Sequence, residues 1–96
     1  MQYLKFLFFI FFFLGSALVG AEQKDYDDCI LKHLKGAKLD IATDTIRRAC
    51  YENYKKTSFI SEKNRAYNNC LLEHLPGVES LQAVMEIKSA CERKYK

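Results

Sequence analysis

The chain has 96 residues, with 15 Lys and Arg against 12 Asp and Glu, a net charge of +3, and four Cys. This length allows one small domain. The nearly balanced charge gives no reason to expect a polyanionic partner, because nucleic-acid binders usually concentrate Lys and Arg on one face. We therefore expect no nucleic acid among its partners.

Residues 1–21 have the three regions of a secretory signal peptide. Lys5 supplies a positive start, a Phe-rich apolar run extends from Phe6 to Leu14, and small residues lead to a cleavage site after Ala21. The alternative is an uncleaved membrane anchor, since Phe6 to Ala21 gives 16 uncharged residues, slightly short of the roughly 17 to 25 that span a bilayer. We favour cleavage because a peptidase site needs the weakly hydrophobic residues before Ala21, whereas a membrane span does not.

One 29-residue segment occurs twice, because residues 26–54 align with residues 67–95 at an offset of 41 without a gap. Eleven of the 29 positions are identical and both Cys intervals are preserved, which indicates a duplicated unit. The identical residues of the first copy are Tyr26, Cys29, Leu31, His33, Leu34, Gly36, Ala42, Ile46, Ala49, Cys50 and Tyr54. We expect two hairpin repeats, residues 22–57 and 58–96, packed as one compact domain.

The first half of each repeat predicts one helix. In the first repeat, apolar residues at helical spacing predict a helix from about Asp25 to Lys35. Acidic residues crowd its first turn and basic residues its last turn, as the helix dipole favours. Gly36 is expected to end this helix in the left-handed conformation, and the matching Pro76-Gly77 is a turn dipeptide.

The second half of each repeat predicts another helix, which Asp40 caps in the first repeat and Ser80 in the second. An apolar stripe at helical spacing follows each cap and places the second Cys of the repeat on the buried side. The two stripes are Ala42, Thr45, Ile46, Ala49, Cys50, Asn53 and Tyr54, and Ala83, Ile87, Ala90, Cys91 and Tyr95, with Leu81 and Val84 at the edge.

The connection between the repeats contains neither Gly nor Pro from residue 55 to residue 63, so we expect a short and ordered segment. Ser58 or Ser61 can cap the following helix. Phe59 and Ile60 are apolar enough to pack over the junction.

An even number of Cys in a short exported chain predicts disulfides. Four Cys allow three pairings, and the repeat selects Cys29–Cys50 and Cys70–Cys91, because each unit could make its own bridge. In an antiparallel hairpin the two sulfurs can lie near one level on facing helices. Closing each loop is worth about 3 kcal/mol, whereas so small a core supplies no more than about 3 to 5 kcal/mol. Reduction is therefore expected to destabilise the mature protein strongly or to unfold it.

His33 and His74 are the residues that suggest a metal or acid–base site. Each lies four residues after a Cys, so a Cys2His2 zinc set is one hypothesis. We favour the other interpretation, because oxidised sulfurs do not bind zinc and the helix dipole explains a His in the last turn. No nucleophile motif or phosphate-binding loop is present in the sequence. We therefore expect a non-enzymatic protein with no catalytic residue, cofactor or metal.

Basic residues lie in or beyond the ends of the second helices: Arg47-Arg48, Lys55-Lys56, and Arg93-Lys94 with Lys96. They are explained as solvated charges that complement the helix dipoles, and contact with an anionic membrane or glycan is the alternative. Four Tyr recur in the repeat and are expected to pack at the hairpin ends rather than to form a binding cage. These are Tyr26, Tyr54, Tyr67 and Tyr95.

The repeat resembles a short motif of uncharacterised bacterial proteins, C-I-L-x-x-[LM]-x-G followed by A-x-x-x-I-x-x-A-C. The first copy carries it from Cys29 to Gly36 and from Ala42 to Cys50, and the second copy matches it over the corresponding residues to Cys91. The resemblance implies a bacterial origin and a helical hairpin. It implies no activity, substrate or catalytic residue.

We therefore predict an all-α protein of two tandem disulfide-closed helical hairpins, forming a small four-helix arrangement after a signal peptide, and exported to the periplasm or secreted. The expected function is a small interaction or structural module with a protein partner. Homodimerisation is a further option, because one hairpin alone is too small to bury its apolar stripe. The alternative function is a membrane- or envelope-binding factor that acts through the basic helix ends.

Overall fold

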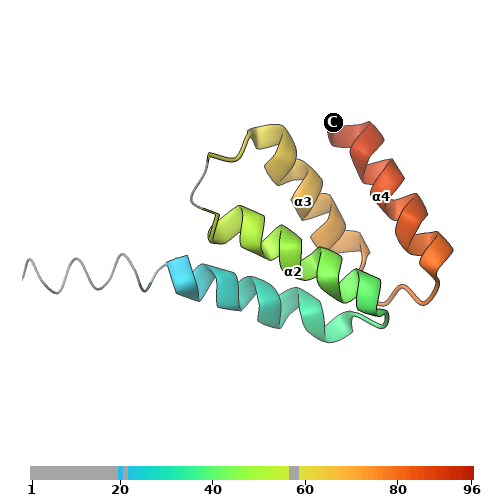
Figure 1. Ribbon diagram of the computed structural model, residues 1–96, viewed down its shortest axis with the longest axis horizontal. Coiled ribbons are helices and arrows are strands. Elements are labelled where there is room, and N and C mark those ends of the chain that lie inside the picture. The colour runs from blue at the N-terminus through green and yellow to red at the C-terminus, as the bar shows by residue number, and fades with distance from the viewer. Residues whose placement is uncertain (1–19, 21, 57–58) are drawn as a thin grey trace, which may run out of the picture.

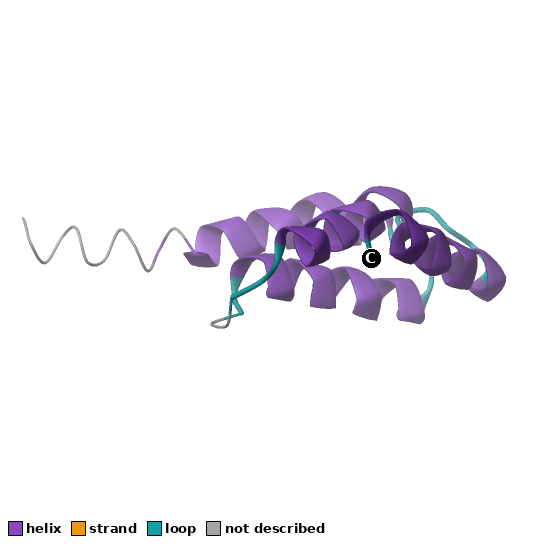
Figure 2. Cartoon of the chain, turned by 90° about the horizontal axis from the view of Figure 1, so that it is seen from above, coloured by secondary structure: helices purple, strands orange, loops and turns teal. Residues whose placement is uncertain are grey.

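A computed structural model describes residue 20, residues 22–56 and residues 59–96. The predicted signal segment, apart from Gly20, lies outside these residues, and so does Ser58 as a candidate cap. All regular structure in the described part is helical (Figure 1 and Figure 2), which confirms the all-α prediction.

The described chain folds into two helical hairpins. The first helix covers residues 22–33 and continues into a 3-10 turn, η1, at Leu34–Gly36. The later helices are α2 (Asp40–Tyr54), α3 (Glu62–His74) and α4 (Leu81–Tyr95).

The first helix includes residues before Asp25, where the sequence predicted its start. Glu, Gln and Lys are good helix formers, and side chains four apart pair along the exposed face of this extension. The Gln23 amide donates to Asp27 at 3.0 Å, and Lys24 pairs with Asp28 at 3.4 Å.

The predicted N-cap residues agree with the structure for two of three helices, with Ser61 one of the two candidates for α3. Ser80 is the N-cap of α4 and accepts from the backbone N–H of Ala83, and Ser61 caps α3 in the same way. The prediction for α2 was wrong, because its N-cap is Leu39 without a side-chain cap, and Asp40 is the first helical residue. An acidic residue there still lies near the positive end of the helix dipole.

The two hairpin turns use their Gly differently. Gly77 has a φ of +86°, so the left-handed residue occurs in the second turn. The prediction that Gly36 would adopt this conformation was wrong. Gly36 instead allows a close approach, because a Cβ there would lie 3.0 Å from the Cβ of Pro76. The N–H of Gly77 donates to the carbonyl of Gly36 at 2.7 Å, so the two turns pack against each other.

Each hairpin is closed by its own disulfide, as the repeat predicted. Cys29 is joined to Cys50 and Cys70 to Cys91, and the Cα atoms are 5.8 Å apart in both pairs. The equal distance confirms that the duplicated Cys spacing produces the same bridged geometry twice.

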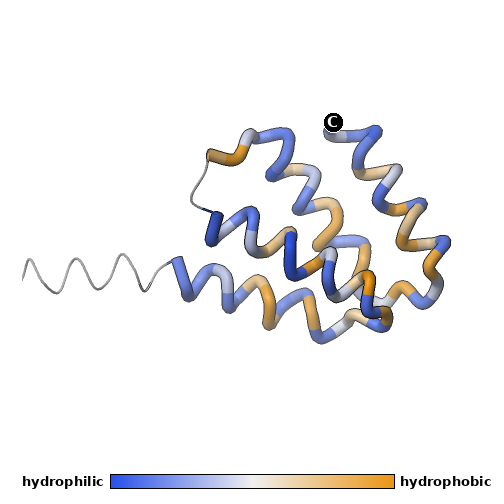
Figure 3. The backbone as a smooth tube through the Cα atoms, viewed as in Figure 1, coloured by the Kyte–Doolittle hydropathy of each residue, from blue (hydrophilic) through white to orange (hydrophobic). Residues whose placement is uncertain are grey.

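The core lies where the two hairpins meet. Figure 1 places the first helix and α4 at opposite edges, with α2 and α3 between them, and α3 packs against both α2 and α4. Buried apolar residues come from all four helices and from the C-cap of α3: Cys29, Ala42, Ile46, Ala49, Cys50, Leu71, Leu72, Leu75, Val84 and Cys91. Away from this core, the N-terminal end of α3 and the C-terminal end of α4 are hydrophilic (Figure 3).

The connection between the hairpins contributes little to this core. Phe59 is 91% exposed, so the prediction that it packs over the junction was wrong, whereas Ile60 is half-buried. The hairpins are joined instead by the side chains of α2 and α3, which face each other directly.

Candidate functional site

The second hairpin has an open groove between α3 and α4, with a volume of about 610 Å³. One wall comes from α3 and the other from α4, and the Cys70–Cys91 bridge crosses between them. The lining residues are Ala66, Asn69, Cys70, Glu73, His74, Ile87, Ala90, Cys91, Lys94 and Tyr95. We call this surface the α3–α4 groove.

The corresponding face of the first hairpin is filled. At the repeat offset of 41, Ile46, Ala49 and Asn53 of α2 match groove residues of α4, and all three are buried, Ala49 to 2% exposure. Their counterparts in α4 are more accessible, since Ile87 is half-buried and Ala90 is exposed. The repeat therefore places identical Ile and Ala side chains in two different environments.

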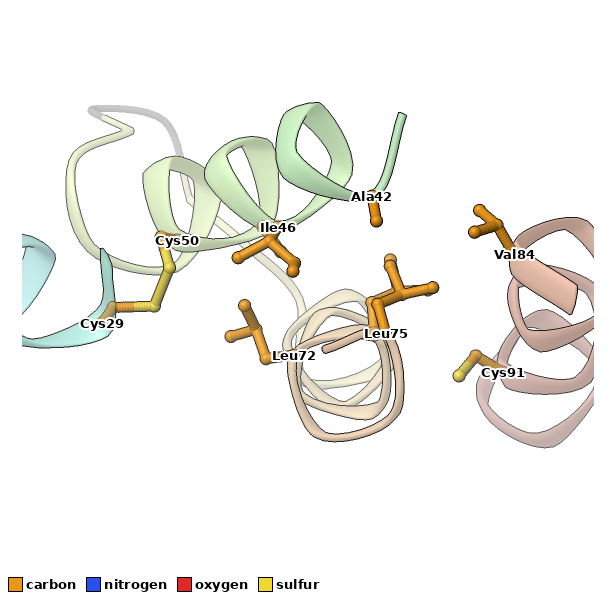
Figure 4. Close-up of a cluster of buried hydrophobic side chains, with 10 residues drawn as sticks. Cys29, Ala42, Ile46, Cys50, Leu72, Leu75, Val84 and Cys91 are labelled. Atoms are coloured by element: carbon orange, nitrogen blue, oxygen red, sulfur yellow. A yellow bond between two sulfur atoms is a disulfide. The ribbon is translucent and has the colours of Figure 1, made fainter. Parts of the chain in front are cut away.

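Helix α3 fills the face of the first hairpin. Figure 4 shows Leu72 reaching from α3 toward Ile46 and the Cys29–Cys50 bridge. Leu72 is only 4% exposed, and Leu71 and Leu75 are buried beside it. Helix α3, which belongs to the second repeat, thus covers this face of the first hairpin. No helix of the described chain covers the equivalent face of the second hairpin.

A buried polar cluster fixes the register of α2 against α3. Asn68 donates to Asn53 at 3.0 Å and to Glu52 at 3.2 Å, and Asn53 donates to Asn69 at 3.0 Å. Arg65 donates to the backbone carbonyl of Asn53 at 3.1 Å. Buried polar groups are tolerated when they are hydrogen-bonded in this way, so the cluster joins the hairpins in one specific alignment.

The two His differ in environment although they are equivalent in the repeat. His33 is half-buried beside α3, and burial is the main cause that lowers its pKa below 6.5. The charge of Lys32 lowers the pKa further, and a hydrogen bond to the backbone of Leu72 partly opposes both effects. His74 is exposed in the wall of the α3–α4 groove, with its Nε2 4.0 Å from Glu73.

The structure does not combine these His with sulfur ligands. All four Cys are joined in disulfides, and among the described residues no group of three or more His, Cys, Asp and Glu is arranged to hold a metal ion. The Cys2His2 hypothesis therefore does not apply to the oxidised protein.

The basic residues that were expected at the helix ends interact within the chain at several points, but the prediction was wrong for Arg47-Arg48, which lie in the middle of α2. Arg47 pairs with Asp44 at 2.7 Å. Lys55 lies 5.2 Å from the ring centre of Tyr26, and the equivalent Lys96 lies 4.2 Å from that of Tyr67. Both rings are half-buried, which agrees with packing of these Tyr at the hairpin ends.

Sequence reasoning did not single out the α3–α4 groove. Its apolar wall on α4 consists of ordinary stripe residues, Ile87, Ala90, Cys91 and Tyr95. Only the structure shows which of the two equivalent stripes is covered. One available signal was the non-identical pairs of the repeat, where Asn53 of α2 is replaced by Lys94 in α4. A buried amide and an exposed cation at equivalent positions indicate different neighbours.

In the part of the chain that the structure describes, no helix combines the length and the apolar character needed to cross a bilayer. A family model described as "Four-cysteine protein VF_A0006-like" matches residues 7–95, a range that includes both repeats and all four Cys. Comparisons with curated proteins and with solved structures gave no match. The chain therefore belongs to the VF_A0006-like family of four-cysteine proteins.

Proposed function

We propose that the protein is a small, exported, non-enzymatic interaction or structural module that binds a protein partner through the α3–α4 groove. The observation that carries this proposal is the difference between two equivalent faces. A helix covers Ile46 and Ala49 in the first hairpin, whereas Ile87 and Ala90 line an open groove in the second. A face that accepts a helix in one repeat is suited to accept one in the other.

The chemistry of the groove supports binding rather than catalysis. Its central lining is apolar, with Ile87, Ala90 and the Cys70–Cys91 bridge, and charged groups stand toward its ends. Interfaces commonly combine an apolar centre with a polar rim. The buried hydrogen-bonding groups of Asn53 and Asn68 are used to join the hairpins, so they are not free to act on a substrate.

The export part of the proposal rests on the disulfides together with the predicted signal peptide. Disulfides form and persist in oxidising compartments such as the periplasm and the extracellular space. Two bridges in a chain of 96 residues indicate such an environment. A periplasmic or secreted location is the one that both features favour.

Site-directed photo-crosslinking of the exported protein tests the proposal. A photoreactive residue at Ala90 in the groove should give discrete protein adducts, whereas the same residue at Arg47, on the exposed side of α2, should not. Adducts of equal yield at both positions, or none at Ala90, would contradict it. Lipid adducts alone would favour the envelope-binding alternative. A hydrolase or transferase activity lost in His74→Ala would contradict the non-enzymatic assignment.

A further inference from the structure

We infer that the α3–α4 groove receives the first helix of a second copy of this chain, so that copies associate head to tail. This inference rests on the proposed function, because it names the partner of the same groove. Two observations on the described residues carry it. The first is the contact that α3 makes with the first hairpin. The second is that charged residues on α4 and on the first helix replace the polar residues that join α2 to α3.

The contact of α3 with the first hairpin serves as the template for the inferred contact between copies. At the offset of 41, α3 is the counterpart of the first helix, and its buried Leu72 matches Leu31. Leu72 is inserted in the first hairpin, whereas Leu31 is 69% exposed. Ile30 and Leu34, which match Leu71 and Leu75, are only half-buried. The first helix therefore presents the same apolar side chains that α3 uses for docking.

The acceptor face is preserved as well. Figure 4 places Leu72 beside Ile46 and the Cys29–Cys50 bridge, and Ala49 is buried in the same core. The repeat copies Ile46, Ala49 and this bridge into the α3–α4 groove. Ile87, Ala90 and the Cys70–Cys91 bridge line it. A second copy that repeats the docking of α3 would place Leu31 on this bridge and cover Ala90.

At the equivalent positions of the repeat, charged residues replace the polar cluster. Inside the chain, Glu52 and Asn53 of α2 face Asn68 and Asn69 of α3. The counterparts are Arg93 and Lys94 at the groove, and Asp27 and Asp28 on the first helix.

Both cations and both carboxylates are exposed. The contacts of Asp27 with Gln23 and of Asp28 with Lys24 lie on the surface, so another molecule can compete for these carboxylates. In the inferred contact, two cations meet two carboxylates, which gives attraction and a defined register.

The charges also select the direction of association. A contact between two first helices would place Asp27 and Asp28 beside the same residues of the partner, and a contact between two grooves would oppose their cations. Only the head-to-tail arrangement pairs opposite charges. Such a contact uses different surfaces on the two copies, so it produces a chain or a closed ring, as in stacked repeat proteins.

Two variants test the inference because each blocks one surface. Leu31→Glu alters the first helix and Ala90→Glu alters the groove. Both positions are exposed in the single chain, so folding should be retained. The wild-type protein should increase in mass with concentration in sedimentation experiments. Each variant alone should bind itself roughly tenfold to a hundredfold more weakly, the effect of losing one apolar side chain from a contact.

Mixing the variants is the decisive measurement. The intact first helix of Ala90→Glu should dock in the intact groove of Leu31→Glu, which gives a 1:1 dimer that grows no further. Phe59→Glu, at an exposed apolar residue outside the contact, is the control and should associate like the wild type. A mixture that stays monomeric, or single variants that associate like the wild type, would overturn the inference.

Charge reversal gives an independent check of register. Asp27→Lys with Asp28→Lys should abolish association, and so should Arg93→Glu with Lys94→Glu. A chain carrying all four substitutions should associate again, because the opposite charges are restored at both surfaces. Failure of this rescue would overturn the inferred pairing.

Failure of this inference can be distinguished from failure of the proposed function. If the wild-type protein is monomeric up to about 1 mM but a photoreactive residue at Ala90 captures a different protein, the second copy is wrong and the proposed function stands. An adduct at Ala90 with residues 1–21 of the same chain would also overturn the inference. If Ala90 gives no adduct at all, both proposals fail.

Discussion

The two hairpins of this protein share their Cys spacing and much of their sequence, and yet they differ in what surrounds them. The first hairpin has a helix inserted across its inner face, whereas the equivalent face of the second forms a groove of about 610 Å³. Ala49 is buried and Ala90 is exposed at the same position of the repeat. The comparison teaches that two copies of a unit can bury different faces when they pack asymmetrically: the same face is covered in one copy and exposed in the other.

The largest expected effect is the loss of the disulfides, which both hairpins need. Reduction should remove about 3 kcal/mol per bridge, comparable with the whole stability of such a small core. We expect loss of helical circular dichroism at 25 °C, or a much lower melting temperature. Unchanged dichroism and melting temperature in reductant would contradict this view.

Removing each bridge separately sharpens the comparison. Replacement of Cys29 and Cys50 by Ala should disturb the face on which Leu72 packs and so destabilise both hairpins. Replacement of Cys70 and Cys91 by Ala should release mainly the outer helix α4, which hydrogen exchange can detect as local loss of protection. Uniform loss of protection in both variants would mean that the hairpins do not differ in this way.

A matched pair of core substitutions gives the next largest effect. Ile46→Ala should lower the free energy of unfolding by about 2 to 5 kcal/mol, because it leaves a cavity between the first hairpin and α3. Ile87→Ala should cost only about 1 kcal/mol, since its side chain is half-buried in an open groove. Urea denaturation at low protein concentration measures both values. Equal losses would show that the groove is covered in solution.

The helix starts offer a smaller and more local test. Ser80→Ala should destabilise α4 by about 1 kcal/mol, because the hydrogen bond from the Ala83 N–H is lost. Leu39→Ser introduces the missing side-chain cap at the equivalent position of α2 and should stabilise it by up to about the same amount. Leu39 is half-buried, so Leu39→Ala serves as the control for its lost packing.

The smallest expected effect is the pH dependence of stability that His33 causes. Because the pKa of His33 is lowered in the folded state, the folded protein binds protons less well than the unfolded chain. Its contribution to stability is therefore complete above the unfolded value of 6.5 and is lost as the pH falls below it. His33→Gln should reduce this acid sensitivity of the melting temperature, and an unchanged sensitivity in this variant would contradict the role of His33.

Several elements were predictable because their signals are local. Helical spacing of apolar residues located the helices, and the duplicated Cys intervals identified both bridges. Ser80 was recognised as a cap from its chemistry, and Ser61 was one of two candidates. One error has a local cause, since Asp40 lies one residue inside its helix. The other has a tertiary cause, because Gly36 allows the close approach of Pro76 from the other hairpin rather than a left-handed backbone.

The candidate site was not predictable in the same way. Ile46 and Ile87 occupy the same place in the same pattern, and nothing within either repeat states that α3 will cover one of them. The replacement of Asn53 by Lys94 in the second repeat reflects the different neighbours of α2 and α4. It becomes interpretable only when the neighbours of Asn53 are known.

Amino-acid sequence alone determined that this chain forms helical hairpins closed by Cys29–Cys50 and Cys70–Cys91, because periodicity and Cys spacing act within one repeat. The tertiary structure decided how the hairpins meet, with Leu72 inserted in the first and a groove beside Ala90 in the second. Burial depends on a partner surface from a distant part of the chain, so identical residues can lie in the core in one repeat and at the surface in the other.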